Sequence, residues 1–146
     1  MWLRVTSEAP DDRRELGRAI KHRVLGVGRD SPPPATGDLF NEFQDWLDSC
    51  VWGEIWTRPG LDLRTRSAVT VAVLIALRSD EEQLVGHMRG GLRNGLSVAE
   101  LVEVILHTAA YAGAPAARRA VRLAREVAQA EVWIASDESK AEGGGQ

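Results

Sequence analysis

The sequence predicts an all-α protein of about six helices, and two kinds of observation indicate this. Apolar residues recur at spacings of three and four along several segments, which places them on one face of a helix. Helix-ending signals separate these segments. Asn94 and Gly95 are suited to a left-handed C-cap, and Gly113 is soon followed by Pro115, which fits a first helical turn.

The first two helices are predicted at residues 11–27 and 38–56. In the first, apolar residues are spaced by four, four and three: Leu16, Ile20, Val24 and Val27. Three consecutive prolines then predict an extended linker, because proline lacks a backbone donor and restricts the residue before it. The second helix carries Phe43 and Trp46, and this aromatic content indicates a core or a subunit contact.

The next three helices are predicted at residues 63–78, 80–93 and 97–111. By periodicity alone, the apolar run AVTVAVLIAL in the first of them could equally be a buried strand. The last one begins with a capping box, in which Ser97 and Glu100 bind each other's backbone amides. This motif marks the start of the fifth helix.

The sixth helix is predicted to begin near Pro115 and to continue through Ala130. After it, residues 136–146 are polar and rich in glycine, which is typical of a disordered tail. The remaining residues, 1–135, are predicted to form a single domain, since a chain of 146 residues can bury one core but not two.

Composition argues against several classes of partner. A net charge of −3 gives no reason to expect nucleic acid binding, which normally needs a basic surface. The single cysteine, Cys50, excludes an intrachain disulfide and indicates a reducing compartment. The longest apolar run, residues 68–77, is too short to span a membrane. We therefore expect a cytoplasmic protein without a membrane partner.

His87 is the first candidate for chemistry. It lies one helical step from Leu84, at the margin of an apolar face. The neighbouring glycines Gly86, Gly90 and Gly91 each weaken a helix by roughly 0.5–1 kcal/mol relative to alanine. Another helix, a subunit or a ligand is therefore expected to approach closely here. The alternative is that His87 is a hydrogen-bonded core residue.

Arg58, Arg64 and Arg66 lie around a turn and in the first turn of a predicted helix. Arginine opposes the positive end of the helix dipole there, so helix stability does not explain it. A bound carboxylate would explain it, because a guanidinium group binds a carboxylate through two parallel hydrogen bonds. Salt bridges to Glu54, to Asp62 or to another subunit are an equal alternative.

A second polar line runs along the fifth predicted helix. Glu100, Glu103, His107 and Tyr111 follow at spacings of three, four and four, which places them on one face. Glu103 could orient His107, although an ordinary exposed face is the simpler interpretation for the two glutamates. Tyr111 fits a structural role as well as a catalytic one. The three histidines of the chain lack the spacing of a zinc site, so no metal is predicted.

Residues 52–115 also carry an ordered series of motifs. A Trp-Gly-x-x-Trp-x-Arg-Pro-Gly-Leu turn precedes an arginine-containing helix, a helix with one histidine, an Asn-Gly-Leu turn and a Tyr-Ala-Gly-x-Pro turn. This series resembles the carboxymuconolactone decarboxylase family. The resemblance implies an AhpD-like helical subunit that assembles into a ring-like homo-oligomer, a trimer or a hexamer. It also favours a helix over a strand for residues 63–78.

The resemblance further implies a decarboxylase that acts on a small carboxylated lactone of the 4-carboxymuconolactone type. Such a substrate contains its own electron sink, so no cofactor is expected. The implied catalytic residues are His87, Gln83 and Tyr111, and the implied substrate-binding residues are Arg58, Arg64, Arg66, Trp52 and Trp56. In this scheme the histidine donates a proton, the arginines bind carboxylates or an oxyanion, and the tryptophans supply a dry wall.

Gln83 departs from the family's pattern, which usually has glutamate four residues before the histidine. An amide can hydrogen-bond to an imidazole but cannot stabilise it as a cation or accept a proton. A related lyase, isomerase or biosynthetic tailoring enzyme is therefore an alternative, as is a noncatalytic ligand-binding oligomer. Related hydroperoxidases have a Cys-x-x-Cys pair before the histidine, and the absence of a thiol from residues 83–86 argues against that chemistry.

Overall fold

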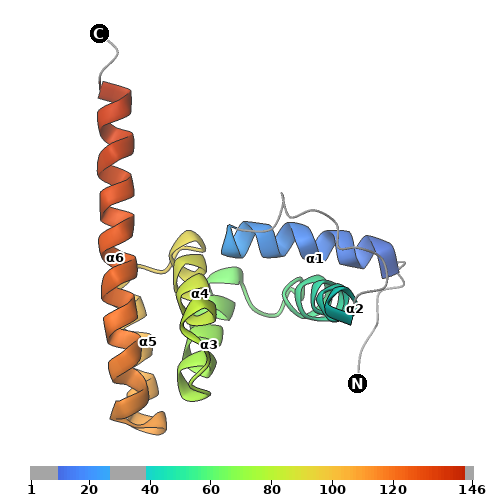
Figure 1. Cartoon of the computed structure of the whole chain (residues 1–146), viewed down its shortest axis with the longest axis horizontal. Helices are drawn as coiled ribbons and strands as arrows, with labels where there is room; N and C mark the ends of the chain where they lie inside the picture. Colours follow the sequence, from blue (N-terminus) through green and yellow to red (C-terminus); the bar gives the residue numbers. More distant parts are fainter. Residues whose placement is uncertain (1–9, 27–38, 144–146) are drawn as a thin grey trace. The chain divides into compact units, whose positions relative to one another are not determined.

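The described part of the chain, residues 10–26 and 39–143 of a computed structural model, is helical and contains no strand. Its elements are α1 (Pro10–Leu25), α2 (Leu39–Trp46), the π-helix η1 (Leu47–Ile55), α3 (Leu63–Ala76), α4 (Glu81–Arg93), α5 (Val98–Ala112) and α6 (Ala114–Gly143). Figure 1 labels the six α-helices, and η1 directly continues α2. The predicted all-α class and the six helices are confirmed. The predicted proline-rich linker lies outside the described residues.

The chain divides into two compact units, Met1–Leu63 (unit 1) and Arg64–Gln146 (unit 2). Unit 1 contains α1, α2 and η1, and unit 2 contains the four remaining helices. The single helix predicted at 38–56 is wrong in one respect, because its second half is a π-helix rather than an α-helix. A π-helix is rare, and apolar periodicity does not distinguish it from an α-helix.

In unit 1, α1 lies beside the helical segment formed by α2 and η1 (Figure 1), and two glycines let the backbones of α1 and η1 come almost into contact. A Cβ atom on Gly17 would lie 1.7 Å from the carbonyl oxygen of Asp48, and one on Gly53 would lie 2.2 Å from the carbonyl oxygen of Arg13. Both partners are backbone atoms, which cannot rotate away. Glycine is therefore required at both positions for this crossing.

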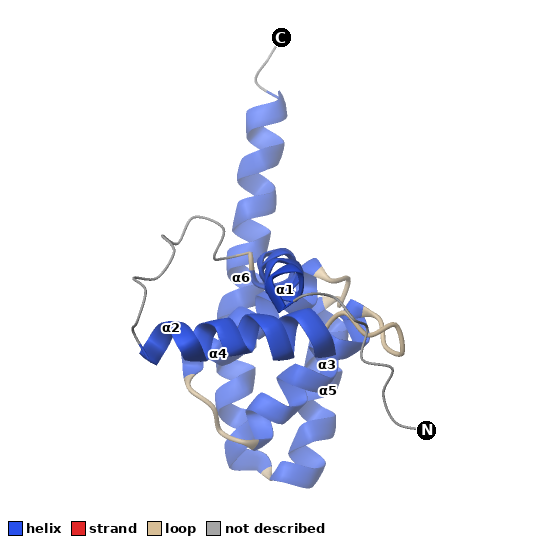
Figure 2. Ribbon diagram, turned by 90° about the vertical axis from the view of Figure 1, so that its right-hand side faces the viewer, coloured by secondary structure: helices blue, strands red, loops and turns tan. Residues whose placement is uncertain are grey.

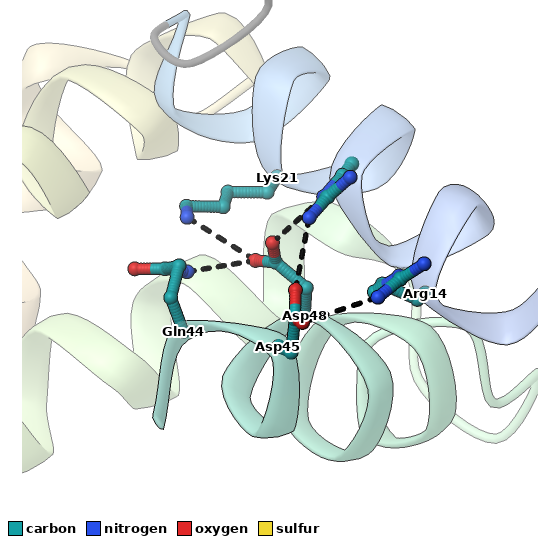
Figure 3. A network of polar contacts seen from close by, with 6 residues as sticks. Arg14, Lys21, Gln44, Asp45 and Asp48 are labelled. Carbon is teal, nitrogen blue, oxygen red and sulfur yellow. Dashed lines mark hydrogen bonds and ion pairs between the residues drawn. The ribbon is translucent and has the colours of Figure 1, made fainter. Parts of the chain in front are cut away.

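A buried carboxylate also joins the helices of unit 1. The Asp48 side chain accepts hydrogen bonds from Arg18 Nε (3.2 Å), Lys21 Nζ (3.2 Å) and Gln44 Nε2 (2.9 Å), and the neighbouring Asp45 pairs with arginines of α1 (Figure 3). Asp48 is only 3% exposed. A buried charge is tolerated when opposite charges and hydrogen-bond donors surround it, as they do here.

Unit 2 is held by a continuous aliphatic core. Its buried members are Val71, Ile75, Leu84, Met88, Leu101, Ile105, Ala116, Ala117, Ala120, Leu123, Ala124 and Val127. Together they come from α3, α4, α5 and α6, so each helix contributes one apolar face. Fully burying a leucine or isoleucine contributes roughly 1.5–3 kcal/mol, which makes this core the main source of stability in unit 2.

Local capping fixes where the helices of unit 2 begin. The Asp80 carboxylate accepts a hydrogen bond from the backbone amide of Gln83 (2.8 Å) at the start of α4. Both bonds of the predicted capping box, between Ser97 and Glu100, are present at the start of α5. Gly95 and Gly113 have φ values of 96° and 88°, conformations that glycine adopts easily.

Helix α6 continues past the ends of its neighbours in unit 2 (Figures 1 and 2). It extends to Gly143, whereas the sequence predicts a disordered tail from Ser136 onwards. Side chains are described only up to residue 130. The assignment of residues 1–135 to one domain, followed by a disordered tail, stays a prediction. Across the described ranges, no helix is both long enough and apolar enough to cross a membrane.

Candidate functional site

His87 lies in the middle of α4, with only 8% of its surface exposed. It follows Leu84, which is fully buried, and precedes Met88, also fully buried, so the core reaches both of its flanks. Burial lowers the pKa of the His87 imidazole, because desolvation penalises the cation. A neutral ring is therefore favoured at neutral pH. In this state the ring has one N–H donor and one nitrogen acceptor.

Gln83 stands one helical turn before His87, in the first turn of α4. Its side chain is exposed, and its backbone amide donates to the Asp80 cap. The helix therefore brings both residues to the same side, but at different depths. No carboxylate takes the position that would stabilise an imidazolium from the preceding turn.

A side-chain hydrogen bond that sequence reasoning missed joins α3 to the end of α4. Asn94 Nδ2 donates to the hydroxyl oxygen of Ser67 (2.9 Å), and Ser67 is only 1% exposed. A Cβ atom on Gly91 would lie 3.7 Å from Ser67 Cβ and 2.9 Å from Leu96 Cδ1. The available signal was the position of Ser67 directly before the apolar run 68–77, because a hydroxyl buried beside that run needs a partner.

Of the glycines near His87, Gly91 lies against neighbouring side chains, but Gly86 does not. A Cβ atom added to Gly86 would meet nothing within 4 Å among the described residues. Packing within unit 2 therefore does not require glycine at position 86. The predicted close approach of a subunit or a ligand at Gly86 stays a prediction.

The three candidate arginines have different environments. In unit 2, Arg64 pairs with Glu100 and donates through Nε to the carbonyl oxygen of Gly95 (3.2 Å). Hydrogen bonds from Ser97, followed by the charge of Arg64, lower the pKa of Glu100. Arg66 is half-buried in the same first turn of α3. In unit 1, Arg58 is exposed in the turn after η1.

Trp52 and Trp56 lie in the small core of unit 1. Their rings stack with centroids 4.8 Å apart, and both residues are buried, at 6% and 7% exposure. Val24 of α1 completes the buried part of this core. The two indoles thus form a packed apolar surface, and within unit 1 they hold η1 against α1.

Tyr111, near the end of α5, is 82% exposed and contacts the His107 ring, with centroids 5.1 Å apart. His107 in turn lines a groove of about 430 Å³ between α3 and α5, the α3–α5 groove. Its lining residues are Ala68, Val69, Ala72, Glu103, Val104, His107 and Thr108. An apolar floor with a few polar groups at its rim is typical of a ligand site.

The described part of the chain holds no group of three or more histidine, cysteine or acidic side chains that could bind a metal ion. Cys50 is half-buried in η1 as a free thiol.

Comparison with known proteins adds a separate finding. Residues 41–126 match the model of the carboxymuconolactone decarboxylase family. The chain is 41% identical over 118 residues to a 4-carboxymuconolactone decarboxylase of Acinetobacter baylyi, which covers 80% of this chain and 87% of that protein. It is 39% identical over 72 residues to a nitrosuccinic acid decarboxylase of Metarhizium robertsii, covering 49% of this chain and 50% of that protein.

Proposed function

The chain belongs to the carboxymuconolactone decarboxylase family and is a carboxy-lyase, and we propose that it acts on a small carboxylated lactone of the 4-carboxymuconolactone type. The observation that carries this proposal is the 41% identity to a protein of that name over 87% of its length. The second relative acts, by its name, on an open-chain acid, and it matches only half of this chain. The lactone is therefore the substrate to test first.

The proposed reaction breaks the bond between the substrate's γ-carbon and its carboxylate. The electron pair passes through the ring double bond to the lactone carbonyl oxygen and forms a dienolate, and carbon dioxide leaves. A proton then adds to carbon and gives the enol-lactone. The substrate supplies the electron sink, so the reaction asks the protein to bind carboxylates, stabilise an oxyanion and deliver a proton.

We assign the proton delivery to His87, and its burial supports a specific sequence of events. The lowered pKa keeps the free imidazole neutral near neutral pH. A bound dicarboxylate would place negative charge near the ring and raise its pKa, because an opposite charge favours the cation. The protonated His87 imidazole, which is the general acid, would then form in the complex with substrate rather than in the free enzyme. Gln83 can hydrogen-bond to a nearby group without adding charge.

We assign substrate binding to Arg58, Arg64 and Arg66. Arg64 already pairs with Glu100, and both side chains are about half exposed. Replacing Glu100 by a substrate carboxylate as the partner of Arg64 therefore costs little free energy. Arg66 lies one residue from Ser67, at the contact of α3 with α4. A guanidinium group binds a carboxylate through two parallel hydrogen bonds, so each of these arginines can hold one carboxylate.

The remaining candidates are assigned supporting parts. The stacked pair Trp52 and Trp56 offers an apolar wall, which strengthens electrostatic interactions by excluding water. Tyr111 offers a hydroxyl that can donate or accept a hydrogen bond. Its exposure of 82% is expected to fall when substrate or another subunit binds.

We also propose that the protein is cytoplasmic and self-associates as a trimer or hexamer. Several large apolar side chains are exposed, and Leu77 at 72%, Leu106 at 55% and Val69 at 51% are among them. An interface with other copies would bury these side chains. A single free cysteine suits a reducing compartment.

Incubation with 4-carboxymuconolactone, followed by mass spectrometry of the enol-lactone, tests the proposed reaction. His87→Ala should lower turnover by roughly 10²-fold or more, because general acid catalysis typically contributes 10²–10⁴-fold. His22→Ala, in α1, is the matched control and should keep wild-type turnover. Gln83→Glu should raise the imidazole pKa and increase turnover. No turnover by the wild type, or full turnover by His87→Ala, would overturn the substrate and the site assignment, respectively.

A further inference from the structure

Two aromatic side chains on α2 are exposed where burial would be expected. Phe43 is 60% exposed and Trp46 is 53% exposed, and their rings stack with centroids 6.0 Å apart. Aromatic residues bury large apolar areas and are enriched at protein interfaces. We call this pair the aromatic knob of unit 1.

An acidic residue without a partner adjoins the aromatic knob. Glu42 is exposed and makes no ion pair or hydrogen bond with the described residues, whereas Asp45 in the same helix pairs with Arg14 and Arg18. The α2 surface therefore combines an exposed apolar pair with one free negative charge.

A groove between α5 and α6 in unit 2 has the complementary character. Its volume is about 510 Å³, and it is lined by Val98, Val102, Ile105, Val121, Ala124, Arg125, Ala128 and Gln129. Arg125, its one charged lining residue, forms no ion pair among the residues described, although Arg122 on the same helix pairs with Glu81 and Glu126. We call this the α5–α6 groove.

We propose that the α5–α6 groove of one copy of the chain receives the aromatic knob of a second copy, with Glu42 pairing with Arg125 across the contact. The proposal rests on the proposed self-association and names its interface. A volume of this size lies within the roughly 300–1,000 Å³ of small-ligand sites and offers an apolar floor to the two rings. Glu42 adjoins the aromatic knob and Arg125 lines the α5–α6 groove, so two charges of opposite sign would meet when the knob enters the groove.

Charge also decides between the α3–α5 groove and the α5–α6 groove. The α3–α5 groove carries Glu103 among its lining residues and no positively charged arginine or lysine. A knob that brings Glu42 would meet a like charge there, and like charges across an interface disfavour association. The α5–α6 groove presents Arg125 instead, so it is the favoured receptor.

Such a contact has a geometric consequence. The knob and the groove are different surfaces, so every copy donates one and receives another. Contacts between unlike surfaces generate closed rings when the rotation closes, and open filaments when it does not. In a ring of three copies, every aromatic knob would occupy the groove of a neighbouring copy. A twofold dimer formed by one surface against itself would leave every knob exposed and every groove empty.

Charge reversal with sedimentation-velocity analysis tests the interface. Glu42→Arg alone and Arg125→Glu alone should each weaken assembly roughly 10²-fold, since a like-charge contact costs several kcal/mol. The double variant Glu42→Arg/Arg125→Glu should restore it. Glu15→Arg and Arg89→Glu are controls with the same charge changes at exposed positions outside the knob and the groove. Both should assemble as the wild type does.

Mixing provides a second arm that does not depend on charge. Trp46→Asp lacks the knob and Val102→Asp lacks the groove, so each should be monomeric alone, while a mixture should give 1:1 heterodimers. Helix content by circular dichroism confirms that each variant folds. Wild-type assembly by Trp46→Asp, or no rescue by the double charge reversal, would overturn the interface but leave self-association standing. A monomeric wild type would overturn both.

Discussion

In unit 1 two helices meet backbone against backbone, whereas in unit 2 four helices meet through aliphatic side chains. Gly17 and Gly53 leave no room for even a methyl group at the crossing of α1 with η1. The core of unit 2 instead contains branched side chains and methionine, which can shift by small rotations. Tolerance to substitution should therefore differ sharply between the units, even though both are helical.

The crossing in unit 1 gives the largest expected effect. Gly17→Ala should destabilise the protein by about 3 kcal/mol or more, because the new Cβ would lie 1.7 Å from a backbone oxygen and the helices must separate. Gly60→Ala in the same unit is the control, since its Cβ meets nothing within 4 Å. Denaturant unfolding, followed by tryptophan fluorescence and far-ultraviolet circular dichroism, measures the change.

The two probes also test the contrast between the units. Four of the five tryptophans precede residue 63, so fluorescence reports mainly on unit 1, while circular dichroism reports on all helices. The fluorescence transition of Gly17→Ala should move further than the dichroism transition. Coincident shifts of both signals would mean that the units unfold as one cooperative body.

The ion pairs give the second contrast. Asp48→Asn should cost about 2 kcal/mol, because hydrogen bonds to a charged group typically contribute roughly 1.5–3 kcal/mol and this carboxylate is buried. Glu81→Gln breaks the exposed pair with Arg122 in unit 2 and should change the unfolding midpoint little. If both variants lose the same free energy of unfolding, burial does not make the Asp48 pairs stronger than the exposed pair of Glu81.

Sequence reasoning predicted unit 2 better than unit 1 for a physical reason. The caps at Ser97 and Gly113 act over three or four residues, so a short stretch of sequence contains both the capping residue and its partner. The Asp48 network and the contact of Gly17 with η1 join residues about thirty positions apart. No local pattern indicates which distant residues will meet.

The candidate site shows the same limit. The position of His87 at the margin of an apolar face was readable from spacing, and the structure buries it there. The hydrogen bond between Asn94 and Ser67 could not be predicted from spacing. Asn94 is already explained by its position at a helix C-terminus, and the partner of its side chain is known only from the three-dimensional structure. Arg64 likewise pairs with Glu100, thirty-six residues away, whereas the sequence analysis considered Glu54 and Asp62 as its partners.

Acid should affect unit 2 through His87. In the folded state its pKa lies below the roughly 6.5 of an unfolded chain, so between those values the unfolded state binds more protons. Stability should therefore be unaffected by this group above pH 7 and fall as pH drops below about 6.5, by at most ~1.4 kcal/mol per pH unit. His87→Gln should lose less stability than the wild type between pH 7 and 5. If the stabilities of the wild type and His87→Gln fall in parallel between pH 7 and 5, groups other than His87 cause the acid sensitivity.

The smallest expected effect separates two glycines of α4 that look alike in sequence. Gly86→Ala should stabilise the fold by roughly 0.5–1 kcal/mol, because alanine favours the helix and its Cβ meets nothing within 4 Å. Gly91→Ala should be nearly neutral, since the same gain is offset by displacing Leu96 Cδ1, the end of a flexible side chain. Thermal unfolding measures both. Turnover gives the sharper information: Gly86 adjoins His87, and a variant that is more stable but slower would indicate that glycine is kept there for a substrate or a second subunit. A more stable variant with full turnover would leave Gly86 without a functional reason.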